Sequence, residues 1–343
     1  MESVLKEGKK QQDGVSVVIC CYNSAARIQE TLRFLFLQKI PPGFNYEIVL
    51  VNNASTDNTK EKIFETLTEA TKEIPATIVD ETTPGLASAR RKGLETARYD
   101  VIVFVDDDNH LDERYLMTAY NIMQEHPEVG IAGGWIRPKL PFYPGKWLEG
   151  NYAALAIGKR FEESKYVDWV FGAGMVIRKQ VFDAFARKGI QLMLSGRLGA
   201  KQTSGDDAEM CQLAQFVGYK IYYAVELILD HKISENRLTR WSFIKGNYRN
   251  VFPVVYFYLL TELIKERDLS VEKCYLAFFD GCVRRAFYFF PRTIFGRFKF
   301  YSFTMLFQNV QLIFWLLTRR SHFKDTYFSI TKNLYHGPAG GRL

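Results

Sequence analysis

Apolar and polar positions alternate along the first 130 residues in a pattern of short and long segments. Short runs rich in β-branched residues predict strands, and longer segments with apolar residues every three or four positions predict helices. The predicted strands are 15–20, 46–51, 76–80 and 101–105. The predicted helices are 25–38, 59–70 and 86–98. This alternation indicates an α/β fold with a mostly parallel sheet flanked by helices.

Beyond residue 130 the pattern becomes irregular, because glycine and proline interrupt the apolar runs. A helix is predicted at 207–217, a strand at 220–223 and further helices from 239 onward. We therefore expect three parts. They are a polar segment at 1–14, a sheet-containing domain at 15–236 and a helical region at 237–343.

Polar side chains follow the predicted strands at the points where those strands end. In chain order they are Tyr22 and Asn23, then Asn52, Asn53 and Asp57, then Asp106 to Asn109. The carboxyl ends of parallel strands lie along one edge of a sheet, where ligands bind. The sequence therefore predicts a functional site at this edge.

Three consecutive aspartates, Asp106 to Asp108, follow the wholly apolar run 101–105. Such a run is typical of a strand buried on both faces. Carboxylates on the turn after it are hard oxygen ligands suited to Mg²⁺ or Mn²⁺, and such an ion neutralises a diphosphate leaving group. The alternative is a solvated acidic turn or a helix N-terminus, where aspartate is common.

A second acidic pair, Asp206 and Asp207, precedes a predicted helix. Paired carboxylates raise one another's pKa, which suits a general base. The alternative is that the two side chains only cap the helix. His231 lies further along the chain and is a candidate metal ligand or a structural histidine.

Charge is unevenly distributed along the chain. Residues 237–343 hold 17 Lys+Arg and 6 Asp+Glu, a local charge of +11, against −4 for the remainder. Bulky aromatics stand beside these basic residues, which suits the cytoplasmic face of a membrane better than nucleic acid. The alternative is that the aromatics form a core of their own. The apolar stretch 298–317 is long enough to span a bilayer, but its central polar residues favour an interfacial or packed helix.

The chain opens with a polar segment that lacks the apolar centre of a secretory signal, so we expect a cytoplasmic protein. Its five cysteines show neither metal-ligand nor disulfide spacing, which indicates reduced thiols. They are Cys20, Cys21, Cys211, Cys274 and Cys282.

An ordered set of motifs resembles the family 2 glycosyltransferases with the GT-A fold, in particular bacterial members that build surface polysaccharides. The motifs are Tyr22-Asn23, Val51-Asn-Asn-Ala-Ser-Thr-Asp57, Pro84-Gly-Leu-Ala-Ser-Ala-Arg90, Val103-Phe-Val-Asp-Asp-Asp108, Gly172-Ala-Gly174 and Gly205-Asp-Asp-Ala-Glu209. The resemblance covers about residues 15–240. No single motif is decisive, but the ordered set is specific.

The resemblance implies an inverting transfer of a sugar from a UDP-, dTDP- or GDP-sugar to a glycan or lipid-linked glycan, with Mn²⁺ or Mg²⁺ as cofactor. It divides the domain into a nucleotide-binding half, 15–130, and an acceptor half, 131–236. Asp207 would be the catalytic base. The implied donor-binding residues are Cys21, Tyr22, Asn23, Asn52, Asn53, Asp57, Arg90, Asp106 and Asp107. The implied metal ligands are Asp108, Asp106 and His231, and the implied acceptor contacts are Gly172, Ala173, Gly174 and Asp206.

The chain departs from the family pattern at two places. Many relatives have aspartate where this chain has Asn52 or Asn53, which leaves the donor base open, and many have glutamate where it has Asp206. Two other functions are alternatives: a nucleotidyltransferase, which would carry a glycine-rich phosphate loop after the first strand, and a degenerate relative that only binds glycans or membranes. Residues 237–241 faintly resemble a signature of processive synthases. Trp241 is therefore either an acceptor contact or a packing residue.

Overall fold

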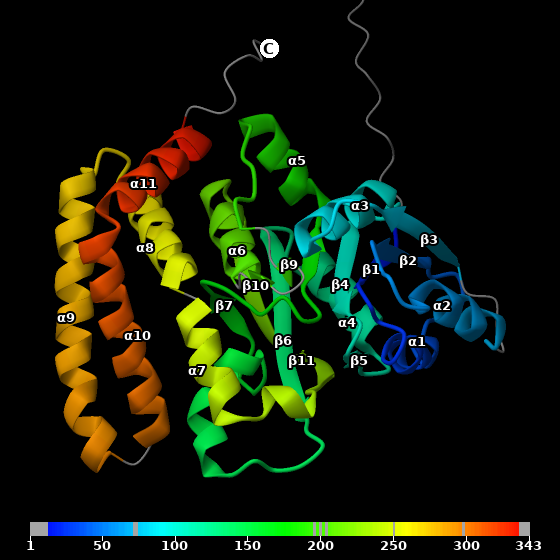
Figure 1. Ribbon diagram of the computed structural model, residues 1–343. Helices are drawn as coiled ribbons and strands as arrows, with labels where there is room; N and C mark the ends of the chain where they lie inside the picture. The colour runs from blue at the N-terminus through cyan, green and yellow to red at the C-terminus, as the bar shows by residue number, and fades with distance from the viewer. Residues whose placement is uncertain are drawn as a thin grey trace, which may run out of the picture.

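A computed structural model of the chain describes residues 13–70, 75–194, 197–198, 201–202, 205–249, 251–296 and 299–335. Most of the segment expected at 1–14 lies outside these residues, as does residue 298 of the expected apolar stretch. In the described part, helices cover both faces of a nine-stranded sheet, and a block of further helices stands beside it (Figure 1).

The first four strands form the parallel part of the sheet. They are β1 (Val15–Cys21), β2 (Tyr46–Asn53), β3 (Ala76–Glu81) and β4 (Val101–Asp106). They lie in the order β3-β2-β1-β4, and every neighbouring pair is parallel. β1, β2 and β4 are almost wholly buried because helices cover both faces, which explains their nearly continuous apolar runs. These four predicted strands are confirmed.

The later strands make the sheet mixed. They are β5 (Asn109–Leu111), β6 (Val129–Lys139), β7 (Lys165–Val167), β8 (Val176–Arg178) and β11 (Lys220–Lys232). β8 runs antiparallel between β4 and β6, and β11 pairs parallel with β6 and antiparallel with β5 and β7. The prediction that this strand ends at 223 was wrong. β11 continues through a register shift between Ala224 and Ile228 and carries His231 within it. β9 (Arg197–Leu198) and β10 (Lys201–Gln202) form a separate two-stranded ribbon.

Two hydrophobic cores fill the space on either side of the sheet. One contains Val17 and Ile19, together with α1 (Ile28–Phe36), α2 (Thr59–Thr68), α4 (Tyr115–Glu125) and the 3₁₀ helix η1 (Lys146–Leu155). The other contains Val18, together with α3 (Leu86–Thr96), α5 (Lys179–Lys188) and α6 (Asp206–Phe216). The alternation of Val17, Val18 and Ile19 between the cores is the period of two expected of a strand.

The helices predicted from residue 239 onward are present. After η2 (Glu235–Arg237) they are α7 (Arg240–Arg249), α8 (Val251–Lys265), α9 (Val271–Phe295), α10 (Lys299–Thr318) and α11 (Arg320–Tyr335). α9 and α10 form a long hairpin at the left of Figure 1. α8 lies between this hairpin and α6 and packs against α6. Near the middle of α10, Asn309 is buried and accepts a hydrogen bond from Arg285 of α9 at 3.0 Å.

Candidate active site

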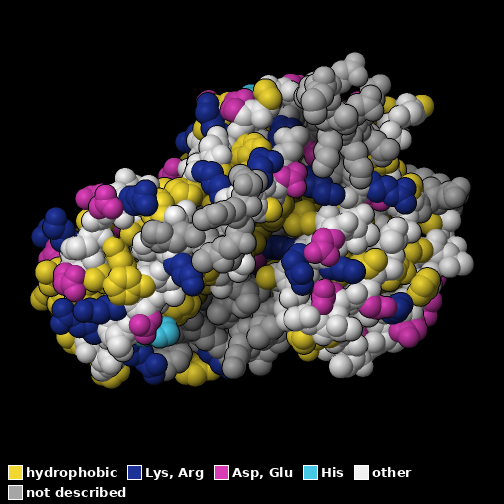
Figure 2. All heavy atoms as spheres, turned by 90° about the horizontal axis from the view of Figure 1, so that it is seen from above, with side chains coloured by type: hydrophobic (Ala, Val, Ile, Leu, Met, Phe, Trp, Pro, Cys, Tyr) yellow, Lys and Arg dark blue, Asp and Glu magenta, His cyan; other side chains and the backbone are white. Residues whose placement is uncertain are grey.

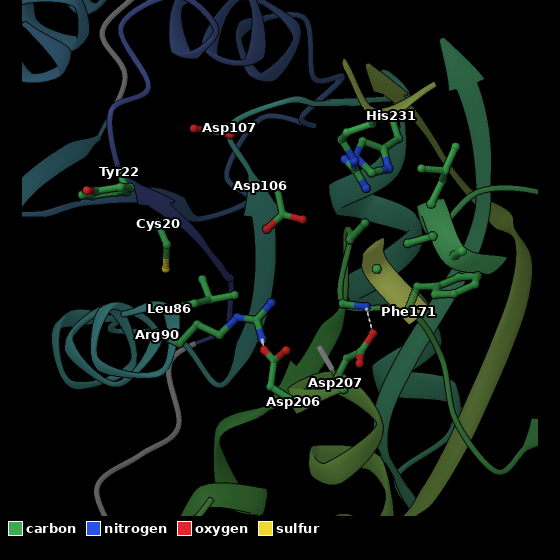
Figure 3. A pocket seen from close by; sticks show the side chains of 18 of the residues that line it. Cys20, Tyr22, Leu86, Arg90, Asp106, Asp107, Phe171, Asp206, Asp207 and His231 are labelled. Atoms are coloured by element: carbon green, nitrogen blue, oxygen red, sulfur yellow. Dashed lines mark hydrogen bonds and ion pairs between the residues drawn. The ribbon is translucent and has the colours of Figure 1, made fainter. Parts of the chain in front are cut away.

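A cavity of about 1100 Å³ opens at the carboxyl ends of β1 and β4. The strand register places Cys20 beside Asp106, so the two strand ends reach the same edge of the sheet, as the sequence predicted. Many of the predicted site residues line this cavity: Cys21, Tyr22, Asn53, Arg90, Asp106, Asp107, Gly172, Ala173, Asp206, Asp207 and His231. The side chains of Asp106, Asp206 and Asp207 face one common space (Figure 3). The structure thus brings together segments from both halves of the domain.

Asp107 anchors the acidic turn to α1. Its carboxylate accepts hydrogen bonds from Arg27 Nη2 at 2.6 Å, from Arg27 Nε at 3.2 Å and from the hydroxyl of Ser24. Thr31 Oγ1 donates to the main-chain carbonyl of Asp107 at 2.9 Å. Arg27 also lines the cavity, although the sequence analysis did not single it out. Its position close to the start of the helix after the first strand is the signal that would have identified it.

Asp108 lies against His231 on a neighbouring strand. The β5–β11 pairing sets His231 opposite Asn109, and Asp108 Oδ1 is 3.5 Å from His231 Nε2. The Nδ1 atom of His231 is buried and has no hydrogen-bond partner among the described residues. No three His, Cys, Asp or Glu side chains in the described part of the chain form a ready metal cluster. Asp108 and His231 therefore form a two-residue donor set beside the cavity.

Ion pairs on either side hold His231 in place. Asp230 accepts a hydrogen bond from Arg137 at 2.5 Å, and Lys232 donates to Glu30 of α1. Hydrogen bonds from Lys232 and Lys139 lower the pKa of Glu30 to about 2, so this carboxylate stays ionised. The strand that carries His231 is thereby tied to α1.

Arg90 and Asp206 form a buried ion pair between α3 and the start of α6. The Arg90 side chain donates to an Asp206 carboxylate oxygen, and its guanidinium lies 5.2 Å from the centre of the Phe104 ring (Figure 3). Arg90 is only 7% exposed, so losing one partner would leave a buried charge without compensation. The predicted acceptor contact Asp206 is therefore already engaged by the predicted donor contact Arg90.

Asp207 lies in the first turn of α6 and is held by main-chain groups. Its Oδ2 accepts a hydrogen bond from Gly172 N at 3.0 Å, and its Oδ1 accepts one from Ala208 N at 2.9 Å. Burial and the neighbouring charge of Asp206 raise the pKa of Asp207 to about 6. A side chain at residue 172 would crowd this contact, because a Cβ there would lie 3.3 Å from that of Asp207. A carboxylate with a pKa near neutrality that faces a cavity is suited to act as a general base.

The polar residues after β1 and β2 join loops to one another. Asn52 donates to Asp80 at 2.9 Å and is not among the cavity-lining residues. Asn53 lines the cavity, but its side chain accepts from Gly85 N at 2.8 Å and so closes the turn before α3. Asn23 accepts from Thr56 N, and Asp57 accepts from Ala25 N and Thr59 N. Their contacts with a donor stay predictions.

Two predicted acceptor contacts lie outside the cavity lining. Gly174 has a left-handed φ of +67°, and a Cβ there would lie 2.3 Å from Leu229, so packing accounts for this glycine. Trp241 is 69% exposed on α7, so it is not packed into a core of the described residues, and its contact with an acceptor stays a prediction. Its neighbours Ser242 and Phe243 do line the cavity, so Trp241 stands close to the cavity wall.

Family models match most of the chain. Residues 16–185 match the model described as glycosyl transferase family 2, and residues 101–317 match glycosyl transferase family group 2. Because the second match covers more than half of the chain, the chain belongs to this family of glycosyltransferases. The predicted family and enzyme class, sugar transfer from a nucleotide-sugar donor, are confirmed. The nucleotidyltransferase alternative is thereby set aside.

Similar proteins include enzymes of glycan synthesis. Glucosyl-dolichyl phosphate glucuronosyltransferase of Haloferax volcanii is 24% identical over 71% of this chain and 78% of the relative. Poly-beta-1,6-N-acetyl-D-glucosamine synthase of Staphylococcus epidermidis is 23% identical over 90% of this chain and 75% of the relative. The crystal structure of S. aureus TarS 1–349 in complex with UDP-GlcNAc matches with a TM-score of 0.51 and 17% identity, over 94% of this chain and 92% of that one. This likeness confirms the predicted GT-A fold.

Proposed function

We propose that this glycosyltransferase moves a sugar to a hydroxyl of a glycan or lipid-linked glycan, with inversion at the anomeric carbon and with Asp207 as the base. One observation carries the proposal. Asp207 has a pKa raised to about 6 and faces the cavity that Arg90 and Asp106 also line. The acceptor class is supported by the relatives, one named for a glucosyl-dolichyl phosphate substrate and one for a polysaccharide product.

In the proposed reaction the acceptor oxygen attacks C1 of the donor sugar as Asp207 takes the hydroxyl proton. The bond between C1 and the diphosphate oxygen breaks on the opposite face, so the anomeric configuration inverts. The hydrogen bonds from Gly172 N and Ala208 N fix the carboxylate, and each of its oxygens still has a lone pair free to accept. Arg90 and Arg27 supply positive charge at the cavity wall, where the diphosphate leaves.

Enzymes of this family generally use a divalent metal, and we assign Asp108 and His231, with Asp106 beside them, to hold Mn²⁺ or Mg²⁺. The residues fit such an ion: a carboxylate and an imidazole lie 3.5 Å apart, and both are largely shielded from solvent. Two or three protein ligands suffice, because such an ion takes its remaining ligands from phosphate oxygens and water. When bound, the ion neutralises charge on the leaving diphosphate.

A panel of UDP-, dTDP- and GDP-sugars with Mn²⁺ or Mg²⁺ tests the reaction. UDP-GlcNAc is the first donor to try, because it is the one bound in the TarS structure. We expect one class of donor to raise the melting temperature and to be hydrolysed slowly in a metal-dependent way. Asp207→Asn should keep the thermal shift and lose the hydrolysis. A chain that responds to no donor, with or without metal, would contradict the proposal.

We further propose that the α9–α10 hairpin binds the cytoplasmic face of a membrane. Residues 281–324 contain eight basic residues and no acidic one. Phe287, Phe295 and Phe314 on this hairpin are 76%, 84% and 68% exposed. Figure 2, seen from above, shows basic, acidic and hydrophobic side chains intermingled at the left, where the C-terminal helices lie. Exposed aromatics beside cationic residues suit the headgroup region of anionic lipids.

The length, composition and burial of α10 indicate how the hairpin would contact the membrane. Among the described residues, α10 is the one helix whose length and composition would allow it to cross a bilayer. Its central polar residue Asn309 is turned toward α9, so the face that it leaves outside is apolar. A helix with one buried polar side and one apolar outer side is suited to lie in the membrane interface.

Vesicle flotation tests this part of the proposal. We expect the protein to float with vesicles of phosphatidylcholine and phosphatidylglycerol, and less so with phosphatidylcholine alone or at high salt. The double substitution Phe287→Ser with Phe295→Ser should reduce flotation, whereas Phe64→Ser should not, because Phe64 is exposed on distant α2. Recovery of the unaltered protein entirely in the unbound fraction would refute membrane contact.

A further inference from the structure

The C-terminal helices also reach the catalytic turn from behind. α8 contacts α6 and the residue before it at three points. Phe257 packs against Gly205, Tyr256 bonds to Glu209, and Thr261 Oγ1 accepts from Gln212 at 2.7 Å. Gly205 has a φ of +105°, and a Cβ there would lie 2.3 Å from the Phe257 ring. α8 is therefore in direct contact with the residue that precedes Asp206 and Asp207.

Glu209 is a buried carboxylate that the proposed reaction does not use. Its oxygens accept hydrogen bonds from the Tyr256 hydroxyl at 2.5 Å, from Met193 N at 2.7 Å and from Leu194 N at 2.9 Å. The side chain is fully buried, and burial raises its pKa to about 7. Three donors on one buried carboxylate offset part of the cost of its desolvation. Glu209 thus ties α6 both to residues 193–194 and to α8.

The spacing of Glu209 from Asp207 gives this contact a consequence for catalysis. Two residues correspond to a rotation of about 200° around an α-helix, so the two side chains leave α6 on nearly opposite sides. Asp207 faces the cavity, and Glu209 faces α8. Because a helix turn is stiff, a rotation of α6 that displaces Glu209 also displaces Asp207.

We propose that Glu209 and Tyr256 are positioning residues for Asp207, so that the C-terminal helical region is part of the catalytic machinery and not only an attachment to it. The inference rests on the proposed role of Asp207 as the base. A misplacement of about 1 Å can lower a rate as much as a hundredfold, so the loss of one hydroxyl that helps to fix the rotation of α6 is expected to affect turnover.

The opposite side of α8 connects it to the outer helices. Tyr258 stacks on Phe278 of α9 with ring centres 4.4 Å apart, and Tyr335 of α11 donates to the carbonyl of Leu263 at 2.6 Å. The hairpin proposed to bind a membrane and the turn that carries Asp207 therefore contact the same helix. Membrane contact and catalysis are linked through α8 in this arrangement.

The test compares two tyrosines of the C-terminal region. Tyr256→Phe removes the hydroxyl that reaches Glu209. Tyr327→Phe removes a hydroxyl that donates to the carbonyl of Leu269 at 2.6 Å, a bond made within the C-terminal region. Each variant is assayed in the full chain for hydrolysis of UDP-GlcNAc, or of the donor that the panel selects in its place, and for its melting temperature. We expect both to lose a few degrees of melting temperature.

The two variants should differ in turnover. Tyr256→Phe should lower kcat about tenfold with the donor KM unchanged, while Tyr327→Phe keeps the kcat of the unaltered chain. Glu209→Gln should lower kcat at least as far, because its amide nitrogen would face a hydrogen-bond donor. Should Tyr256→Phe fail to fold, Thr261→Ala removes the weaker contact to Gln212, and we expect a two- to fivefold loss of kcat by the same reasoning.

The outcomes separate this inference from the function on which it rests. Full kcat in Tyr256→Phe, or in Thr261→Ala where that variant replaces it, overturns the positioning role. If Asp207→Asn is inactive in the same series, that failure concerns the α6–α8 contact alone. Turnover retained in Asp207→Asn would instead overturn the proposed base itself.

Discussion

Two pairs of adjacent aspartates, Asp107 with Asp108 and Asp206 with Asp207, lie at or beside the same cavity but in different surroundings. On the turn after β4, Asp107 is bonded to Arg27 and Asp108 lies against His231. At the start of α6, Asp207 accepts hydrogen bonds from main-chain N–H groups in a buried place beside the charge of Asp206. A cation or a metal favours the ionised carboxylate, whereas burial near another negative charge favours the protonated one. One residue type is thereby suited to bind charge at the first turn and to transfer a proton at the second.

The largest expected effect separates the two turns directly. Asp207→Asn should lower turnover by a factor of about 10² to 10⁴, the usual contribution of a general base. Asp107→Asn should lower turnover far less. The Asp107 carboxylate bonds to Arg27 and anchors the turn, and it is not the proposed base. Donor hydrolysis and calorimetric binding of the donor, measured side by side, check both variants. Equal losses of turnover would show that the turns do not divide the work as proposed.

The metal provides the next test of the comparison. Asp108→Ala should weaken the Mn²⁺-dependent binding of the donor about 10- to 100-fold and leave metal-free binding unchanged, because it removes one of the two residues proposed to hold the metal. Titration calorimetry with and without Mn²⁺ measures the difference. Asp207→Asn serves as the control and should bind metal and donor normally. If Mn²⁺ strengthens donor binding equally in both variants, Asp108 is not a ligand.

Much of the fold could be predicted from the sequence because the pattern that sets it is local. The strands 46–51 and 101–105 stand out because parallel strands buried on both faces need continuous apolar runs. The end of β11 was missed because the register shift between Ala224 and Ile228 depends on pairing with β6, which composition does not reveal. Local pattern thus identifies the strands of this domain better than it identifies their ends.

The candidate site also combines residues that the local sequence indicates with contacts that it does not. Asp207 and Asp108 could be proposed because each stands in a motif, and His231 because it follows a short apolar run. The pairing of Arg27 with Asp107 and the burial of Glu209 beneath Tyr256 join residues that are far apart in sequence. These pairings follow from packing: the position of Arg27 near the start of the helix after the first strand is a signal for that residue, but the sequence does not indicate its partner.

The pH dependence of turnover and of stability tests the same contrast between the two aspartate pairs, with a smaller expected effect. With a pKa of about 6, Asp207 is ionised above that value, so kcat should be constant at high pH and about tenfold lower one unit below the pKa. The linked stability has the opposite sign. Because the folded pKa lies above the unfolded one, ionised Asp207 costs the fold about 3 kcal/mol at neutral pH, and this cost disappears as pH falls below about 4.

Denaturant unfolding of Asp207→Asn at several pH values measures that cost. The variant should be the more stable chain at pH 7, and its advantage should shrink toward pH 4. A variant that is less stable at neutral pH would show that the fold stabilises the Asp207 carboxylate. That result is expected for the aspartates after β4 and not for those at the start of α6.

The smallest expected effect concerns the cation at the first turn. Arg27→Ala removes an ion pair whose arginine side chain is 41% exposed, so it should cost the fold only about 1 kcal/mol. Turnover should fall only a few fold, because Asp108 and His231, the residues proposed to hold the metal, remain in place. Lys39→Ala, which breaks the surface pair with Glu113, is the matched control and should leave turnover unchanged. A loss of donor binding in Arg27→Ala as large as in Asp108→Ala would mean that the β4 turn binds charge as one unit, with Arg27 at its centre.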